Sequence, residues 1–301
     1  MRIISLLPAA TEMVYLLGLG DDLVGVSHEC DFPSEAALKP HVTRTIVDAS
    51  RNGAEIQRQV GQLQHDHRSL YELDVARIRD LRPDVILTQE ICEVCAVSRS
   101  EVEAMAMDLY GTPNVVSFEP STLDGMLQNI AYLGEVTGRG ELATHEVERL
   151  RERIERVRAE AEPRDHGVVC LEWLQPPMAA GHWIPEIIEV SGACDRLMRS
   201  GEKSRRCEWE AVQAAAPETL IIAPCGYSLP KAVAEYRTTE LPAWWGRLPA
   251  VRSGRVFAID GHNFTSRPGP RLIDTLEIVA TILTDKPFTS ATLGVDYVRI
   301  V

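Results

Sequence analysis

The chain has 301 residues, of which 45% are hydrophobic and 25% charged, and 31 basic against 44 acidic side chains give a net charge of −13. This composition is typical of a globular protein with one large or two smaller domains. The acidic balance argues against a nucleic-acid partner, because such proteins need clustered Lys and Arg. The sequence contains no run of 18 apolar residues, so it predicts no membrane-spanning helix.

The first half of the chain has the pattern of a parallel α/β domain. Short apolar runs at 3–6, 23–27, 85–88 and 115–118 predict buried strands. Helical patterns separate these runs, and the first of them is a Pro-led helix over 8–18 that closes on a glycine. Strands that alternate with helices in this way favour a parallel sheet.

The middle of the chain predicts one long amphipathic helix over 141–163, which ends at Pro163. Its apolar positions mostly step by three or four, and the remaining positions are nearly all charged. Further strand-like runs follow at 167–171, 219–223 and 255–259. The expected fold class is therefore α/β, with two Rossmann-like lobes of parallel sheet joined by one long helix. The expected domains are an N-terminal lobe 1–140, an interlobe helix 141–163, a C-terminal lobe 164–285 and a tail 286–301.

Candidate binding residues gather in the loops that follow the predicted strands. In parallel α/β folds, ligands meet the loops beyond the carboxyl ends of the strands. Aromatic side chains among them would suit a large flat ligand. The candidates are Pro8, Ala9, Ala10, Thr11, His28, Cys30, Glu90, Cys92 and Cys95 in the first lobe, and Trp173, His182, Trp183, Cys225, His262, Phe264 and Arg267 in the second.

The segment E-I-C-E-V-C-A-V at 90–97 places Cys92 and Cys95 just after a predicted strand. A C-x-x-C pair can ligate a metal or cycle as a dithiol, but a closed zinc site needs four ligands. Cys30 from a neighbouring loop could add one. Three interpretations therefore stay open, namely a metal or cluster site made by Cys30, Cys92 and Cys95, the wall of a ligand pocket, and buried inert thiols.

The N-terminus reads Met-Arg followed at once by Ile-Ile-Ser-Leu-Leu-Pro, without the basic segment, apolar segment and cleavage site of a signal peptide. We therefore expect a cytoplasmic protein. A periplasmic or extracellular location would follow if a signal peptide had been removed. In a reducing compartment, the seven cysteines are not expected to form a disulfide framework.

Several motifs resemble those of the class III substrate-binding proteins of ABC transporters, in particular the vitamin B12-binding ones. The resemblance covers roughly residues 2–285. It rests on I-I-S-L-L-P-A-A-T-E-M at 3–13, V-G-V-S at 24–27, D-F-P at 31–33, L-R-P-D-V-I-L-T at 81–88, L-Q-P-P at 174–177 and F-T-S-R-P-G-P-R-L at 264–272.

The resemblance implies the two-lobed fold of class III periplasmic binding proteins, with cobalamin held between the lobes. By motif match it gives ligand contact to Pro8, Ala9, Ala10, Thr11, Trp173, Phe264 and Arg267. The family also docks on a permease through acidic surface residues. This chain carries Ala76 where an acid is expected, so permease docking is doubtful.

Two classes of function follow. The first is a non-catalytic binding protein for cobalamin or a related corrinoid or tetrapyrrole, in which His28, His182 or His262 could be an axial ligand to the metal. The alternative is a cysteine-ligated metalloprotein or enzyme with zinc or an iron–sulfur cluster, acting on a small substrate in the same cleft.

Overall fold

A computed structural model of the chain describes residues 1–66, 68–90, 99–288 and 293–301. The chain divides into two compact units. Unit 1 comprises Met1–Pro120 and Gly125–Val147, and unit 2 comprises Ser121–Asp124 and Glu148–Val301. The boundary in the chain falls inside helix α6 (Gly140–Glu160). None of the described helices combines the length and the apolar character that a membrane span requires.

Unit 1 is built on a four-stranded, fully parallel sheet. In order across the sheet, its strands are β2 (Leu23–Val26), β1 (Ile3–Ser5), β5 (Val85–Gln89) and β6 (Asn114–Phe118). The helices around it are α1 (Pro8–Leu16), α2 (Gly53–His65), α3 (Val75–Leu81), α4 (Arg99–Met107) and α5 (Leu123–Thr137), with a short 3₁₀ turn η1 (Ala36–Leu38). A small antiparallel pair, β3 (Thr43–Thr45) and β4 (Tyr71–Leu73), lies outside the main sheet.

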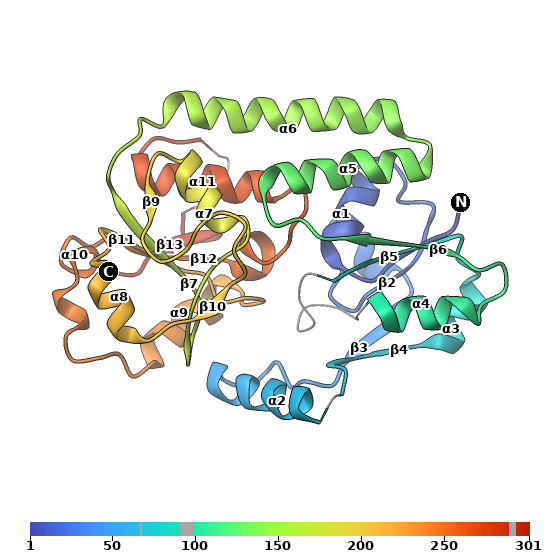
Figure 1. The fold of residues 1–301 in the computed structure, drawn as a ribbon, viewed down its shortest axis with the longest axis horizontal. Helices are drawn as coiled ribbons and strands as arrows, with labels where there is room; N and C mark the ends of the chain where they lie inside the picture. The colour runs from blue at the N-terminus through green and yellow to red at the C-terminus, as the bar shows by residue number, and fades with distance from the viewer. Residues whose placement is uncertain (67, 91–98, 289–292) are drawn as a thin grey trace. The chain divides into compact units, whose positions relative to one another are not determined.

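The core of unit 1 explains why its strands are almost wholly apolar. Figure 1 shows α1 and α5 on one face of the sheet and α3 and α4 on the other. Ile4 and Ile86 pack against Ile78 of α3 and Val102 of α4. A strand covered by helices on both faces carries apolar side chains on both, so it reads as a continuous apolar run. All four runs predicted as strands in this half are strands in the structure.

Unit 2 contains a seven-stranded sheet that is parallel at its centre and antiparallel towards its edges. Its parallel strands are β7 (Gly167–Leu174), β9 (Cys194–Asp195), β11 (Thr219–Ile222) and β12 (Val256–Ile259). Its antiparallel strands are β8 (Pro177–Ala179), β10 (Arg205–Arg206) and β13 (Tyr297–Arg299). The α/β class expected from the sequence is confirmed, and the antiparallel edges are an addition that the apolar runs did not indicate.

The helices of unit 2 cover both faces of this sheet. They are α7 (Ile184–Val190), α8 (Trp209–Ala215), α9 (Leu229–Thr238), α10 (Pro249–Arg252) and α11 (Leu272–Thr284), with the shorter η2 (Trp245–Arg247) and a π-helical turn η3 (Gly261–Thr265). Val169, Leu171 and Ile222 of the sheet form one buried cluster with Val212 of α8 and Trp245 of η2. Tyr236 of α9 and Ala250 of α10 belong to the same cluster.

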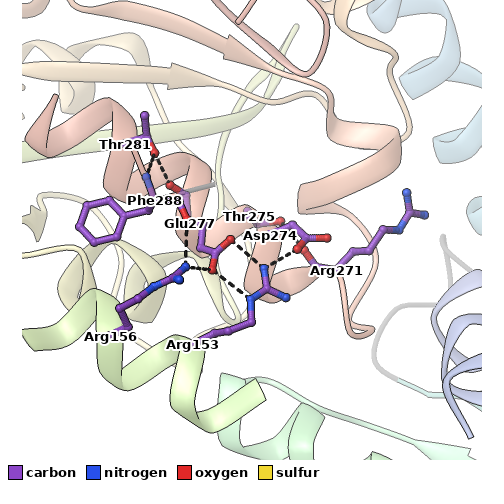
Figure 2. Close-up of polar contacts among 8 residues, drawn as sticks. All are labelled: Arg153, Arg156, Arg271, Asp274, Thr275, Glu277, Thr281 and Phe288. Carbon is purple, nitrogen blue, oxygen red and sulfur yellow. Dashed lines mark hydrogen bonds and ion pairs between the residues drawn. The ribbon is translucent and has the colours of Figure 1, made fainter. Parts of the chain in front are cut away.

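The part of α6 that belongs to unit 2 is fixed to α11 by charged side chains (Figure 2). The guanidinium of Arg153 donates to both carboxylate oxygens of Glu277, at 3.0 and 2.7 Å, and to Asp274 at 2.6 Å. Arg156 donates to Glu277 at 2.7 Å and to the carbonyl of Phe288 at 3.0 Å. The same network therefore holds α6, α11 and the start of the C-terminal tail together.

Candidate functional site

In unit 1, the loop after β1 turns directly into α1. Leu7 is the N-cap and Pro8 occupies the first helical turn, where a missing N–H costs nothing. Thr11 donates its hydroxyl hydrogen to the sulfur of Cys30 at 3.0 Å, and both residues are buried. Two residues that the sequence placed in separate loops are thus in contact. Ala9 and Ala10 are buried beside them in the chain, and Pro8 is half-buried.

His28 follows β2 and is held by Thr43. Its backbone N–H donates to the Thr43 hydroxyl at 3.0 Å, and its ring Nδ1 lies 2.7 Å from the same oxygen. The other ring nitrogen, Nε2, is 3.5 Å from a carboxylate oxygen of Glu29. Burial lowers the pKa of His28, and it does so against the opposing effect of the Glu29 carboxylate. The imidazole is therefore neutral at neutral pH.

Glu90 is exposed and is the last described residue of its loop. Cys92 and Cys95 lie outside the described residues, so their assignment stays a prediction. Within the part of the chain that the structure describes, no group of three or more His, Cys, Asp or Glu side chains could hold a metal ion. The zinc or iron–sulfur alternative therefore has no support from the described residues.

In unit 2, two aromatic side chains pack against each other, one near the end of β7 and one in the loop after β11. Trp173 lies inside β7 rather than in the loop that follows, and its ring meets Tyr227 edge to face with centroids 5.2 Å apart. The ammonium of Lys231 lies 3.7 Å from the centre of the Tyr227 ring. Burial raises the pKa of Tyr227 and lowers that of Lys231. Cys225 is exposed, and its backbone N–H donates to the carbonyl of Glu172 at 3.0 Å.

His182 and Trp183 lie between β8 and α7. His182 has a left-handed backbone with φ +54°, which is uncommon for a residue with a Cβ. Its Nδ1 is 3.4 Å from the hydroxyl of Ser204, and burial, followed by the charge of Lys203, lowers its pKa. Trp183 is buried, and its indole N–H donates to the carbonyl of Thr265 at 3.0 Å.

The segment that follows β12 carries His262, Phe264 and Arg267. His262 and the half-buried Phe264 are in η3. Asp260 begins this turn, because its carboxylate accepts the backbone N–H of Asn263 at 2.8 Å. Arg267 is only 5% exposed, and its guanidinium lies 2.8 Å from Nε2 of His262. Arginine has no acceptor, so Nε2 of His262 accepts this hydrogen bond.

The structure thus brings predicted residues together in small groups within each unit. Thr11 contacts Cys30, and His262 contacts Arg267. Four residues outside the predicted site residues contact predicted residues or one another, and tertiary structure joins two of them, Thr43 and Ser204, to His28 and His182. The four are Thr43, Ser204, Tyr227 and Lys231. Of these, Tyr227 is recognisable in the sequence as an aromatic residue in a loop after a predicted strand, and Lys231 follows it by four residues.

Comparisons with known proteins agree with this architecture. Residues 3–262 match the family model described as periplasmic binding protein. The chain is 24% identical over 285 residues to the vitamin B12-binding protein of Vibrio cholerae, a match that covers 94% of this chain and 88% of the relative. A vitamin B12-binding protein of Yersinia pestis is 24% identical over 73% of this chain and 69% of its own length.

Solved structures show the same fold. The periplasmic vitamin B12 binding protein of Vibrio cholerae superposes with a TM-score of 0.67 at 24% identity, covering 94% of this chain and 96% of that one. A periplasmic heme binding protein of Pseudomonas aeruginosa gives a TM-score of 0.69 at 19% identity, covering 97% and 94%.

These matches correct one expectation. The cytoplasmic location expected from the N-terminal sequence is wrong, because the matching family and the solved relatives are periplasmic binding proteins. A pattern at one end of a chain is a weaker indicator than a fold shared along its length. The relatives named above are binding proteins for vitamin B12 or heme. With a family match that spans residues 3–262, this chain belongs to the periplasmic binding protein family.

Proposed function

We propose that this protein is a non-catalytic binding protein for a corrinoid, either cobalamin or a close relative. The observation that carries the proposal is the relationship to vitamin B12-binding proteins along 94% of the chain. The residues at the carboxyl ends of its strands support it, because they combine aromatic rings with polar and basic groups.

A corrinoid has a broad, largely apolar ring with amide groups on its periphery, so its binding site needs flat apolar contacts and hydrogen-bonding groups. In unit 2, the half-buried Trp173 supplies aromatic surface, and the buried Tyr227 packs against it. Arg267 supplies a guanidinium whose position is fixed by His262. In unit 1, the turn at Pro8–Thr11 and the His28 loop supply backbone and hydroxyl groups.

An absorbance titration tests the proposal. The purified protein is titrated with cyanocobalamin, aquocobalamin, dicyanocobinamide and haemin. We expect saturable binding of at least one corrinoid with a Kd below about 100 μM, a weak limit on the affinity scale. Absence of corrinoid binding up to this concentration would overturn the proposal, and saturable binding of haemin alone would replace the corrinoid by haem.

A further inference from the structure

One exposed segment of unit 2, residues 196–206, is strongly basic although the chain as a whole is acidic. It carries five basic side chains against the single acid Glu202, so it contributes +4 to a net charge of −13 and leaves −17 on the rest of the chain. All five basic residues are exposed, namely Arg196, Arg199, Lys203, Arg205 and Arg206. We call residues 196–206 the basic segment. Solubility does not require it, because a uniformly acidic surface is soluble as well.

Most of the positive charge of the basic segment is not neutralised within the described structure. Arg196 pairs with Asp165 at 2.7 Å. Among the described residues, no carboxylate oxygen lies within 4.0 Å of a side-chain nitrogen of the other four basic residues. The carboxylate of Glu202 instead accepts the backbone N–H of Arg199 at 3.1 Å. By contrast, exposed arginines of α4 and α6 pair with carboxylates one turn away.

The backbone of the basic segment is fixed to the rest of unit 2. The carboxylate of Asp195 accepts two backbone N–H groups at the start of the segment, at 2.8 and 2.9 Å. In the turn that follows, the N–H of Gly201 donates to the carbonyl of His182 at 2.9 Å. At the end of the segment, β10 pairs with β8. The charged surface therefore exists before any partner binds, and a partner need not order it.

Protection of a sheet edge explains only part of this charge. β10 is the edge strand of the seven-stranded sheet, and charged side chains on an edge prevent pairing with other chains. That role accounts for Arg205 and Arg206, which form β10. It does not account for Arg199 and Lys203, which precede the strand. The charge extends beyond the edge that needs protection.

The side chains of the basic segment indicate the chemistry of a partner. Four of the five basic residues are arginines, whose planar guanidinium matches a carboxylate with two parallel hydrogen bonds. None of the exposed large apolar side chains of the described residues lies in the segment, so it has no apolar group to insert into a lipid layer. An extended anionic bilayer would also meet the −17 on the rest of the chain. A compact acidic surface would meet the segment alone, because charges are screened beyond about 8 Å at physiological ionic strength.

We propose that the basic segment is a docking surface for a partner protein, which it recognises through a patch of Asp and Glu side chains. The contact is polar and salt-sensitive, because it consists of exposed charges without an apolar centre. It involves residues outside the proposed corrinoid-binding set, so it does not depend on the identity of the ligand.

A fluorescein-labelled peptide of ten glutamates is the probe, and fluorescence anisotropy with the full chain is the measurement. The titration uses about 100 mM salt, where the Debye length of about 10 Å lets the peptide sense the segment more than distant acidic residues. We expect saturable binding with a Kd below about 100 μM, which is lost at about 500 mM salt. A Gly-Ser peptide of the same length should not bind.

Two charge-reversal variants locate the contact. Lys203→Glu combined with Arg206→Glu changes two exposed side chains of the segment that make no hydrogen bond to a described residue. The matched control combines Arg247→Glu with Arg252→Glu, which changes the net charge equally at exposed positions of unit 2 outside the segment. We expect the first variant to weaken peptide binding at least about tenfold and the control to change it by less than about twofold. Urea denaturation confirms that both variants fold.

Three results would overturn the proposal. The first is no saturable binding of the glutamate peptide by the parent protein at about 100 mM salt. The second is an equal loss of affinity in the two variants, which would show an effect of net charge and not of the basic segment. The third is binding to vesicles of phosphatidylglycerol and phosphatidylcholine without binding to the peptide, which would make a lipid surface the partner.

Discussion

Arg153 of α6 and Glu277 of α11 form a two-pronged ion pair, with Nε and Nη2 of the arginine 3.0 and 2.7 Å from the two carboxylate oxygens. Glu277 is only 4% exposed, and Arg156 donates to it as well. Removal of this carboxylate leaves Arg153 with Asp274 and takes the Glu277 ion pair from Arg156. We expect Glu277→Ala to lower the free energy of unfolding by about 2–3 kcal/mol, as measured by urea denaturation.

Glu155 offers a matched control on α6. It pairs with Arg158 one turn away, and both side chains are more than half exposed. An exposed pair is screened by water and loses side-chain entropy when it forms, so Glu155→Ala should change stability little. Equal destabilisation by the two substitutions would show that the Glu277 network contributes no more than a surface ion pair.

Gly134 of α5 is required by the close approach of α6 in unit 1. A Cβ at this position would lie 2.3 Å from the Cβ of Ala143. Gly134→Ala should therefore destabilise the protein by about 1–3 kcal/mol, as overpacking usually does. Gly61 of α2 has nothing within 4 Å of such a Cβ, so Gly61→Ala should stabilise by about 0.5–1 kcal/mol through helix propensity. Thermal unfolding of both variants checks the opposite signs.

The sequence predicted the central strands and the long helix well, because their signals are local. Buried parallel strands are continuous apolar runs, and α6 has a periodic apolar stripe. The strands that were missed are two or three residues long and often polar, such as Arg205–Arg206 and Thr43–Thr45. Their pairing partners, and not their own residues, make them strands.

The candidate site was predictable only as a set of loops. The apolar runs end where the loops begin, so His28 and Arg267 could be named in advance, whereas Trp173 lies inside β7. The partners of these side chains could not be named, because those contacts depend on tertiary structure. Thr43 is 15 residues from His28, and Ser204 is 22 residues from His182. No local pattern links a hydroxyl to an imidazole over such separations.

Because the carboxyl group of Asp195 in β9 is buried, we expect the free energy of unfolding of the protein to depend on pH. Its carboxylate accepts the backbone N–H groups of Leu197 and Met198 at 2.8 and 2.9 Å, but burial dominates and raises its pKa from 3.8 to about 6. The folded state thus binds a proton more tightly than the unfolded state does. The stability that the protonated Asp195 contributes is therefore present below about pH 4 and is lost as the pH rises to about 6.

Asp195→Asn removes this titration while keeping an oxygen for the two backbone N–H groups. We expect the free energy of unfolding of the parent protein to fall between pH 4 and pH 6 relative to that of the variant, by about 2–3 kcal/mol for a shift of this size. Urea denaturation of both proteins across this range is the measurement. Parallel pH profiles would show that Asp195 titrates normally.

Trp173 tests the aromatic surface of unit 2. Its indole N–H donates to the carbonyl of Gln175 at 3.2 Å, and its ring meets Tyr227 edge to face, so its orientation is fixed before any ligand binds. If a corrin ring packs on this surface, Trp173→Ala should weaken cyanocobalamin binding by about 1–3 kcal/mol, the scale for burial of a large apolar side chain. Trp173→Phe should lose less, because it keeps an aromatic face.

Trp209 packs edge to face on Trp245 with centroids 5.3 Å apart, and Trp209→Phe is the control for a general loss of packing in the same unit. An affinity for cyanocobalamin that is unchanged in Trp173→Ala, with Tyr227 still buried, would place the ligand away from this aromatic pair.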